Sequence, residues 1–228
     1  MSKPAALFQP AKTAPQAATL GGDAAGLGRQ AAWDRLLKLV LRLTVSAVCV
    51  GLLAASSRVS VPFFPVPLTL QTLAVLLVGA ALGPVWGAST VFSYLAVGLM
   101  GAPVFHSGLG GPGILFGPTG GYLVAFIPAA YLIGLAVAGV RRAGLLATWR
   151  GLLILCAGAL AASVAVYAIG VPWLSLFPGM GIHRAVVVGM TPFVLGDVLK
   201  AAVAIGAVRS GASLWRRMGG GSIGGSLF

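Results

Sequence analysis

Two opposite charges lie three residues apart in the last strongly apolar run of the chain, residues 185–208. They are Asp197 and Lys200, in the stretch Gly-Asp-Val-Leu-Lys. A charge at bilayer depth costs roughly 2.5 to 3.5 kcal/mol on insertion scales, so a charged residue in such a run is a candidate for function by default. The chain has three acidic residues, and the other two, Asp23 and Asp34, precede the first long apolar segment. We therefore expect a solute to bind at the Asp197–Lys200 pair.

The spacing of the pair indicates what the two groups can do. Residues three apart on a helix share one face, so both side chains can point into one cavity. A carboxylate accepts hydrogen bonds from ligand N–H groups, and an ammonium donates to a ligand carboxylate or carbonyl. Other interpretations stay open: the charges neutralise each other in a structural pair, they act as acid and base in a membrane enzyme, or Asp197 titrates in a proton-coupled carrier.

Composition defines the class of protein that carries the pair. Hydrophobic residues make up 58% of the chain, charged residues 8%, and the mean hydropathy is +1.01, whereas soluble domains carry about 25% charged residues. The chain is predicted to be a multi-pass membrane protein. Its net charge of +12 does not indicate nucleic-acid binding, because the basic residues lie at the ends of apolar runs. His106 and His183 stand far apart, so we expect no metal site, and no cofactor.

The apolar runs predict an all-α fold of six transmembrane helices. The runs cover residues 36–57, 68–82, 85–100, 122–140, 151–170 and 186–208. We expect a flexible N-terminal tail at 1–32, a six-helix membrane domain at 33–210 and a flexible C-terminal tail at 211–228. Twelve of the fifteen basic residues precede or enter span one, lie between spans four and five, or follow span six. The positive-inside rule therefore places both termini in the cytoplasm.

Two irregular segments are expected on the external side. Residues 61–67 contain three prolines and two adjacent phenylalanines, Phe63 and Phe64. Such a loop is either a lid over a pocket or a membrane-interface anchor. Residues 101–121 are rich in glycine, and irregular backbone of this kind is tolerated at membrane level only when it is buried in protein or lines a cavity.

Several of these segments together resemble the BioY family. They are Val66-Pro67-Leu68-Thr69-Leu70-Gln71-Thr72-Leu73, Leu82-Gly83-Pro84, Gly101-Ala102-Pro103-Val104-Phe105, Phe116-Gly117-Pro118-Thr119-Gly120-Gly121-Tyr122 and Gly196-Asp197-Val198-Leu199-Lys200. The resemblance implies a substrate-binding S component of an energy-coupling factor (ECF) transporter in the bacterial cytoplasmic membrane. The implied function is high-affinity biotin binding and uptake, not catalysis. A solitary or proton-coupled carrier of biotin or another small vitamin remains the alternative.

The resemblance also implies roles for individual residues. It places Asp197 and Lys200 in the biotin pocket, with the segment 119–122 as the neighbouring wall. Within that wall, Gly120 and Gly121 would let backbone approach the ligand. Tyr122 would either contact the ligand or anchor the membrane interface. Thr119 is alternatively a helix cap, and Gln71 either lines the pocket or ties helices together.

Transport implies partners beyond the ligand and membrane lipid. The chain has no G-x-x-x-x-G-K-[ST] phosphate loop, so energy must come from elsewhere. The family resemblance implies a transmembrane coupling protein and two ATP-binding-cassette ATPases, and a homo-oligomer is left open. Ala47, Gly51 and Ala55 form a small-residue stripe on span one. The resemblance assigns it to docking on the coupling protein, and packing within the bundle is the alternative.

Overall fold

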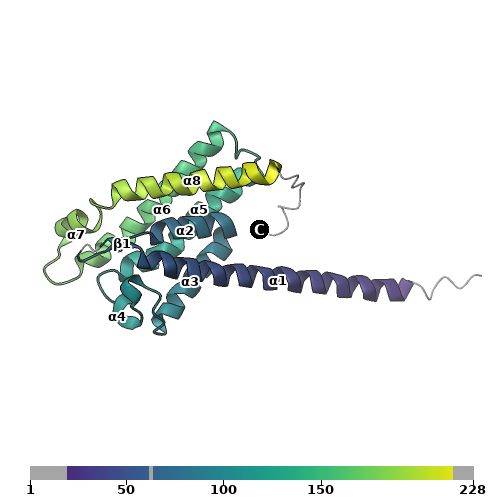
Figure 1. The fold of residues 1–228 in the computed structure, drawn as a ribbon, viewed down its shortest axis with the longest axis horizontal. Coiled ribbons are helices and arrows are strands. Elements are labelled where there is room, and N and C mark those ends of the chain that lie inside the picture. Colours follow the sequence, from purple (N-terminus) through teal and green to yellow (C-terminus); the bar gives the residue numbers. More distant parts are fainter. Residues whose placement is uncertain (1–19, 62–63, 218–228) are drawn as a thin grey trace, which may run out of the picture. The chain divides into compact units, whose positions relative to one another are not determined.

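The computed structural model describes residues 20–61 and 64–217 of the chain. By their contacts the residues divide into two units, Met1–Arg42 and Leu43–Phe228, and the cavity and its walls lie in the second. Figure 1 shows the elements. The helices are α1 (Leu20–Arg58), α2 (Gln71–Leu82), α3 (Pro84–Leu99), η1 (His106–Gly108), α4 (Pro112–Leu115), α5 (Gly120–Arg142), α6 (Trp149–Ser175), α7 (Ile182–Gly189) and α8 (Val194–Arg217), and the strands are β1 (Ser60–Val61) and β2 (Leu68–Thr69).

Six apolar helical segments correspond to the six expected spans. Within the described residues, three helices are long and apolar enough to cross a membrane, and the bent pair α7 and α8 would make a fourth. The remaining two, α2 and α3, are shorter apolar helices. They are separated at Gly83, whose φ of 80° suits glycine, and Pro84 begins α3. The tight turn expected between these two segments is confirmed.

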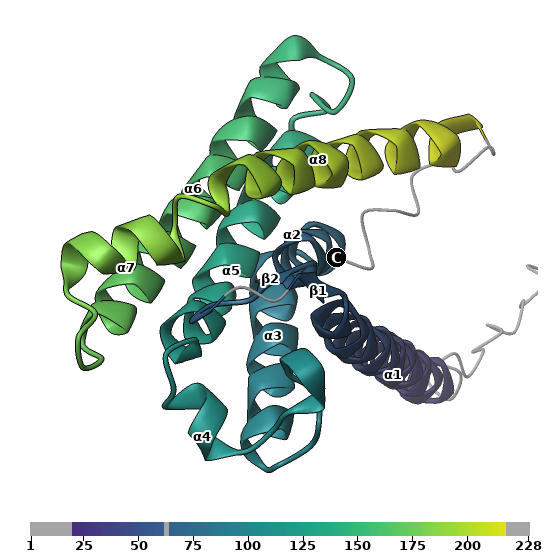
Figure 2. The same cartoon turned by 60° about the vertical axis from the view of Figure 1, so that its left-hand side comes forward.

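Helix α5 is the central element of the second unit. It packs against α2, α3 and α6, while α8 contacts α2 and α6 (Figure 2). Glycines let the backbones approach closely. A Cβ on Gly79 would overlap the Ala130 carbonyl oxygen, and one on Gly134 would lie 2.7 Å from the Gly83 carbonyl carbon. Such contacts are typical of membrane helices, which associate by close packing of small residues.

The Gly-rich segment is folded onto this bundle. The N–H of Gly111 donates to the carbonyl oxygen of Gly98 over 2.7 Å, and the buried ring of Phe105 packs edge-on against Tyr94. The Trp173 indole donates to the carbonyl oxygen of Gly117 over 2.9 Å. Phe105 is buried and lines the cavity together with His106 and Thr119, whereas Gly101, Gly113 and Phe116 are exposed. The expectation that this irregular backbone is buried in protein or lines a cavity is therefore confirmed for only part of the segment.

The prediction of one continuous last span is wrong. The chain leaves the helix at Met190 and re-enters it at Val194, and α7 and α8 are bent by 49° at this break. Pro192 lies within it, and a proline disfavours helical backbone at the residue before it. The break places Asp197 in the first turn of α8.

The helices also extend into the expected tails. Helix α1 begins at Leu20, so residues 20–32 are helical in the structure, where a flexible tail was expected. Helix α8 continues to Arg217, past the predicted boundary at residue 211. Four alanines in the N-terminal extension favour helix. The rest of both predicted tails, residues 1–19 and 218–228, lies outside the described residues.

Candidate functional site

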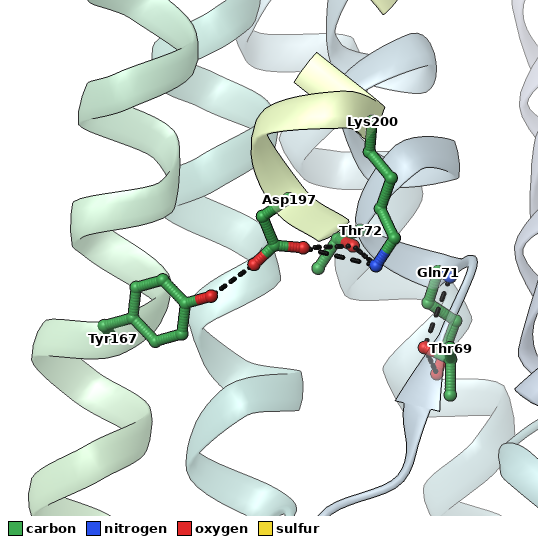
Figure 3. Close-up of polar contacts among 6 residues, drawn as sticks. All are labelled: Thr69, Gln71, Thr72, Tyr167, Asp197 and Lys200. Atoms are coloured by element: carbon green, nitrogen blue, oxygen red, sulfur yellow. Dashed lines mark hydrogen bonds and ion pairs between the residues drawn. The ribbon is translucent and has the colours of Figure 1, made fainter. Parts of the chain in front are cut away.

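The Asp197–Lys200 pair is formed as the sequence predicts, with both groups on one face of α8. The Lys200 ammonium nitrogen lies 3.2 Å from Asp197 Oδ1, and the side chains are only 11% and 12% exposed. Figure 3 shows the pair with its neighbours. Burial of both charges requires polar partners, because an ionised group without them is strongly destabilising in a low-dielectric interior.

Two further helices supply those partners. The Thr72 hydroxyl, in the first turn of α2, donates to Asp197 Oδ1 over 3.1 Å and accepts from Lys200 over 2.8 Å. The Tyr167 hydroxyl of α6 donates to Asp197 Oδ2 in a short hydrogen bond. Three helices thus meet at one carboxylate, and we call these four residues the polar cluster (Figure 3).

The polar cluster faces a partly open cavity between α2, α5, α6 and α8. All four cluster residues line the cavity, and so do Thr69, Gln71 and His106. Most of the remaining lining side chains are apolar: Val66, Pro67, Phe105, Leu123, Phe126, Val166 and Phe193. A ligand here meets polar groups on one side and apolar or aromatic side chains elsewhere.

Gln71 fulfils both alternatives that the sequence left open. Its amide nitrogen donates to the Tyr94 hydroxyl over 2.7 Å, and that hydroxyl donates to the carbonyl oxygen of Val104 over 2.9 Å. These bonds tie α2 to α3 and to the Gly-rich segment. Gln71 is nevertheless among the residues that line the cavity.

The segment 119–122 lies beside the cavity but contributes to it unevenly. Thr119 and Tyr122 line the cavity, whereas Gly120 and Gly121 do not belong to its lining. A Cβ on Gly120 would overlap the Leu115 carbonyl, and one on Gly121 would overlap Trp173. The structure therefore explains both glycines by helix packing, in contrast to the expected backbone contact with a ligand.

For Tyr122 and Thr119, the structure bears on the alternatives to a place in the cavity wall, an interface anchor and a helix cap. Tyr122 is 7% exposed and its hydroxyl donates to the carbonyl oxygen of Gly189 over 3.0 Å, so it is not an interface anchor. Thr119 occupies the N-cap position of α5 without a side-chain capping hydrogen bond. Both side chains remain available as cavity wall.

The aromatic loop contributes less than expected. Phe64 is 94% exposed and does not line the cavity, and Phe63 lies outside the described residues. The strands β1 and β2 pair antiparallel on either side of this loop, and Val66 and Pro67 from it do reach the cavity. A lid role for Phe64 would require a different position of its ring.

The small-residue stripe on α1 faces away from the rest of its unit. Ala47, Gly51 and Ala55 are exposed, and a Cβ on Gly51 would meet no atom within 4 Å. The alternative that these residues pack within the bundle is not what the structure shows. Ser57, two residues after Ala55, is buried instead and donates to the carbonyl oxygen of Val104 over 2.8 Å.

Sequence reasoning missed two of the four cluster residues, Thr72 and Tyr167. Tyr167 was detectable, because it is the one tyrosine in the fifth apolar run and a buried tyrosine hydroxyl usually has a partner. Thr72 adjoins Gln71 in the segment that carries the family resemblance. No group of three or more metal-ligating side chains was found among the residues that the structure describes.

An apolar helical bundle with a largely buried ion pair that lines a cavity defines a class, the membrane-embedded solute-binding proteins. The particular family follows from comparison with known proteins, because the BioY family matches residues 29–219. The chain belongs to the BioY family.

Named relatives and a solved structure agree with this assignment. The chain is 37% identical over 163 residues to the probable biotin transporter BioY of Pyrococcus horikoshii, covering 72% of this chain and 91% of that protein. It is 36% identical to the biotin transporter BioY of Thermotoga maritima, covering 72% and 90%. The crystal structure of an S-component for biotin from an ECF-type ABC transporter matches with a TM-score of 0.66 and 28% identity, covering 76% of this chain and 92% of that one.

Proposed function

We propose that this chain captures biotin and takes part in its uptake across the cytoplasmic membrane, as the substrate-specific S component of an ECF transporter. The observation that carries the proposal is a buried ion pair lining a mainly apolar cavity, in a chain whose BioY relatives are named biotin transporters. The protein is a transporter subunit of the multi-pass membrane class and not an enzyme.

The cavity chemistry suits the two halves of biotin. The ureido ring of biotin carries N–H donors and a carbonyl acceptor, which complement a carboxylate and an ammonium. Asp197 therefore accepts from a ureido N–H, and Lys200 donates to a ligand oxygen. The sulfur-containing ring and the valerate chain are apolar over most of their length, and they pack against Phe105, Phe126 and Phe193.

Apolar walls and a few fixed polar groups also account for selectivity. A cavity that hydrogen-bonds a particular group rejects ligands without that group strongly, because its own polar atoms are then left unpaired. A vitamin without a ureido ring would not offer the polar cluster the same set of donors and acceptor. We therefore expect biotin to be preferred over vitamins of similar size.

The energy for uptake comes from partners in this proposal. The chain lacks a phosphate-binding loop for ATP, so a coupling protein and two ATP-binding-cassette ATPases supply the energy. The exposed stripe of Ala47, Gly51 and Ala55 is the docking face for the coupling protein. Small residues allow the close helix approach on which association in lipid depends.

Competition binding tests the proposal. Purified protein in detergent is mixed with radiolabelled biotin, and unlabelled biotin, thiamine or riboflavin is added in excess. We expect retention of the label, with displacement by biotin alone. Absence of retention, or equal displacement by all three vitamins, would refute the assignment of biotin as substrate.

A further inference from the structure

A histidine of the Gly-rich segment, His106, lies in the cavity wall outside the polar cluster. It begins η1 and lines the cavity next to Phe105. Among the described residues, the imidazole has one hydrogen-bond partner, the Ser107 hydroxyl, 3.3 Å from Nδ1. No fully buried side-chain nitrogen or oxygen of the described chain lacks a partner, so the unpartnered Nε2 remains accessible to solvent. A ligand in the cavity can therefore use Nε2.

The backbone around His106 holds the ring in place. The N–H of Phe105 donates to the carbonyl oxygen of Leu109 over 3.0 Å, and the N–H of Gly108 donates to the carbonyl oxygen of Phe105 over 3.1 Å. Phe105 is 1% exposed and its ring packs edge-on against Tyr94, so it anchors this turn in the bundle. A side chain carried by such a turn is positioned before a ligand arrives, which reduces the entropy cost of binding.

The polar cluster is a poor site for a ligand anion. Lys200 and Asp197 lie 3.2 Å apart and their charges cancel. A ligand carboxylate that approached Lys200 would also approach Asp197, and like charges at such distances repel each other. An acidic ligand therefore needs a second polar contact elsewhere in the cavity, or its carboxylate stays in solvent.

The surroundings of His106 favour an anion instead. Arg58, the last residue of α1, donates to the carbonyl oxygen of Pro103 over 2.7 Å, and its Nη1 lies 3.0 Å from the position of a Cβ on Gly108. This guanidinium adds positive charge beside the turn. Burial lowers the pKa of the His106 imidazole, so without ligand the ring is neutral near neutral pH and can take up a proton when a carboxylate approaches. Apart from the polar cluster, the other titratable side chains of the described chain that line the cavity or pack against this turn are uncharged tyrosines, Tyr94 and Tyr122.

We propose that His106 is a specificity-determining residue that donates a hydrogen bond from Nε2 to the carboxylate of the ligand, at a polar contact separate from the polar cluster. This inference rests on the proposed function, because biotin has a carboxylate at the end of its valerate chain, away from the ureido ring. Asp197 and Lys200 then bind one end of the ligand and His106 binds the other. His106 is protonated in the complex, so binding takes up a proton from solvent and is stronger at lower pH.

The test compares biotin with biotinamide, in which a neutral amide replaces the carboxylate at nearly the same size. Dissociation constants of both ligands are measured at about pH 6 and about pH 8, where the valerate carboxylate stays largely ionised and a histidine changes its charge. The proteins are wild type, His106→Gln, which removes the titratable ring, and His183→Gln. His183 is exposed on α7 and does not line the cavity, so it is the matched control. The ratio of the two constants cancels any titration that affects both ligands equally, including that of the polar cluster.

We expect wild type and His183→Gln to bind biotin about tenfold or more tightly than biotinamide at about pH 6, the size expected for a hydrogen bond between charged groups. This preference should shrink severalfold at about pH 8, because less of the His106 imidazole is protonated there. In His106→Gln, the preference should fall to about threefold or less and be the same at both pH values, because glutamine cannot take up a proton.

A preference for biotin that persists in His106→Gln with the pH dependence of wild type would overturn the proposed contact. Equal affinity of the wild type for the two ligands would also overturn it, because the carboxylate then stays in solvent. If gel filtration shows that His106→Gln does not fold, the pH series of wild type and His183→Gln decides, and a preference that is the same at both pH values overturns the contact. Failure of the wild type to bind biotin at all would instead refute the proposed function.

Discussion

At Thr72 a single hydroxyl joins the two buried charges to a second helix. It donates to Asp197 over 3.1 Å and accepts from Lys200 over 2.8 Å. Without it, one acceptor site on Asp197 and one N–H of Lys200 would lose their partner inside the bundle. An unpaired buried polar group is costly, and more so when it is charged. Thr72 is therefore a positioning residue for the pair that we propose to bind the ligand.

Thr72→Val keeps the shape of the side chain and removes the hydroxyl. We expect the affinity for biotin to fall about tenfold, since the loss of hydrogen bonds to charged groups costs on the order of 1.5 to 3 kcal/mol. Isothermal titration calorimetry measures the change. Ser93→Ala is the control, because Ser93 is exposed, its hydroxyl donates to the carbonyl oxygen of Ser89 in its own helix, and it does not line the cavity. Equal affinity of Thr72→Val and wild type would contradict the positioning role.

At the level of residues, the sequence predicts the two charged members of the polar cluster but not their two neutral partners. Asp197 and Lys200 are conspicuous because charges inside an apolar run are rare and costly. Thr72 and Tyr167 are common residue types in membrane helices, and only the packing of α2 and α6 against α8 brings them to the carboxylate. Gly120 and Gly121 were instead predicted as ligand contacts, although packing explains them. In the sequence, a glycine needed for packing cannot be distinguished from one that lies beside a ligand.

At the scale of elements, glycine contacts determine how closely α2, α3 and α5 approach. Gly79 is buried where α2 meets α5, and Gly87 of α3 packs against it, so that a Cβ on Gly87 would lie 2.8 Å from the Gly79 Cα. Helices α2 and α5 carry Gln71, Thr72, Tyr122 and Phe126 into the cavity wall. Close helix packing and cavity shape are therefore linked.

Gly79→Ala is expected to lower the free energy of unfolding by about 1 to 3 kcal/mol, because the added methyl group overpacks the contact with Ala130. Thermal unfolding in detergent measures the effect. Gly139→Ala on α5 is the matched control, since a Cβ there meets no atom within 4 Å and alanine favours helix. A melting temperature of Gly79→Ala at or above that of Gly139→Ala would contradict this account of the packing.

The elements themselves were largely predictable, but their breaks were less so. Hydropathy locates six apolar segments, and Gly83-Pro84 marks the turn between two of them because both residues have strong backbone preferences. The break between α7 and α8 was missed, although Pro192 marks it, because an apolar run continues across it. Helix in residues 20–32 was missed because that region has no apolar periodicity.

At the scale of the whole molecule, the surfaces that we propose for ligand capture and for partner docking are separate. The cavity residues belong to α2, α5, α6, α8, the segment before α2 and the segments between these helices, whereas the exposed stripe belongs to α1. A change on the stripe can thus affect transport without affecting binding of biotin to the isolated subunit.

Gly51→Leu tests this separation. A Cβ at this position has no atom within 4 Å. Because substitutions at exposed positions usually have small effects, the biotin affinity of the purified protein should stay within about twofold of wild type. Biotin uptake by cells that also express the coupling protein and the ATPases should fall severalfold. Val48→Leu, at an exposed position beside the stripe, is the control. Unchanged uptake in Gly51→Leu would contradict docking at this face.

The central claim is that a buried anion and cation on α8 hold biotin, and a calorimetric titration of biotin tests it most directly. Wild type, Asp197→Asn and Lys200→Ala are compared, with Asp34→Asn and Lys38→Ala as controls at exposed positions. We predict binding by wild type and both controls, and at least about tenfold weaker binding by each cluster variant, because removing one partner of a buried polar contact costs about 1 to 3 kcal/mol. Wild-type affinity in both Asp197→Asn and Lys200→Ala would contradict the claim.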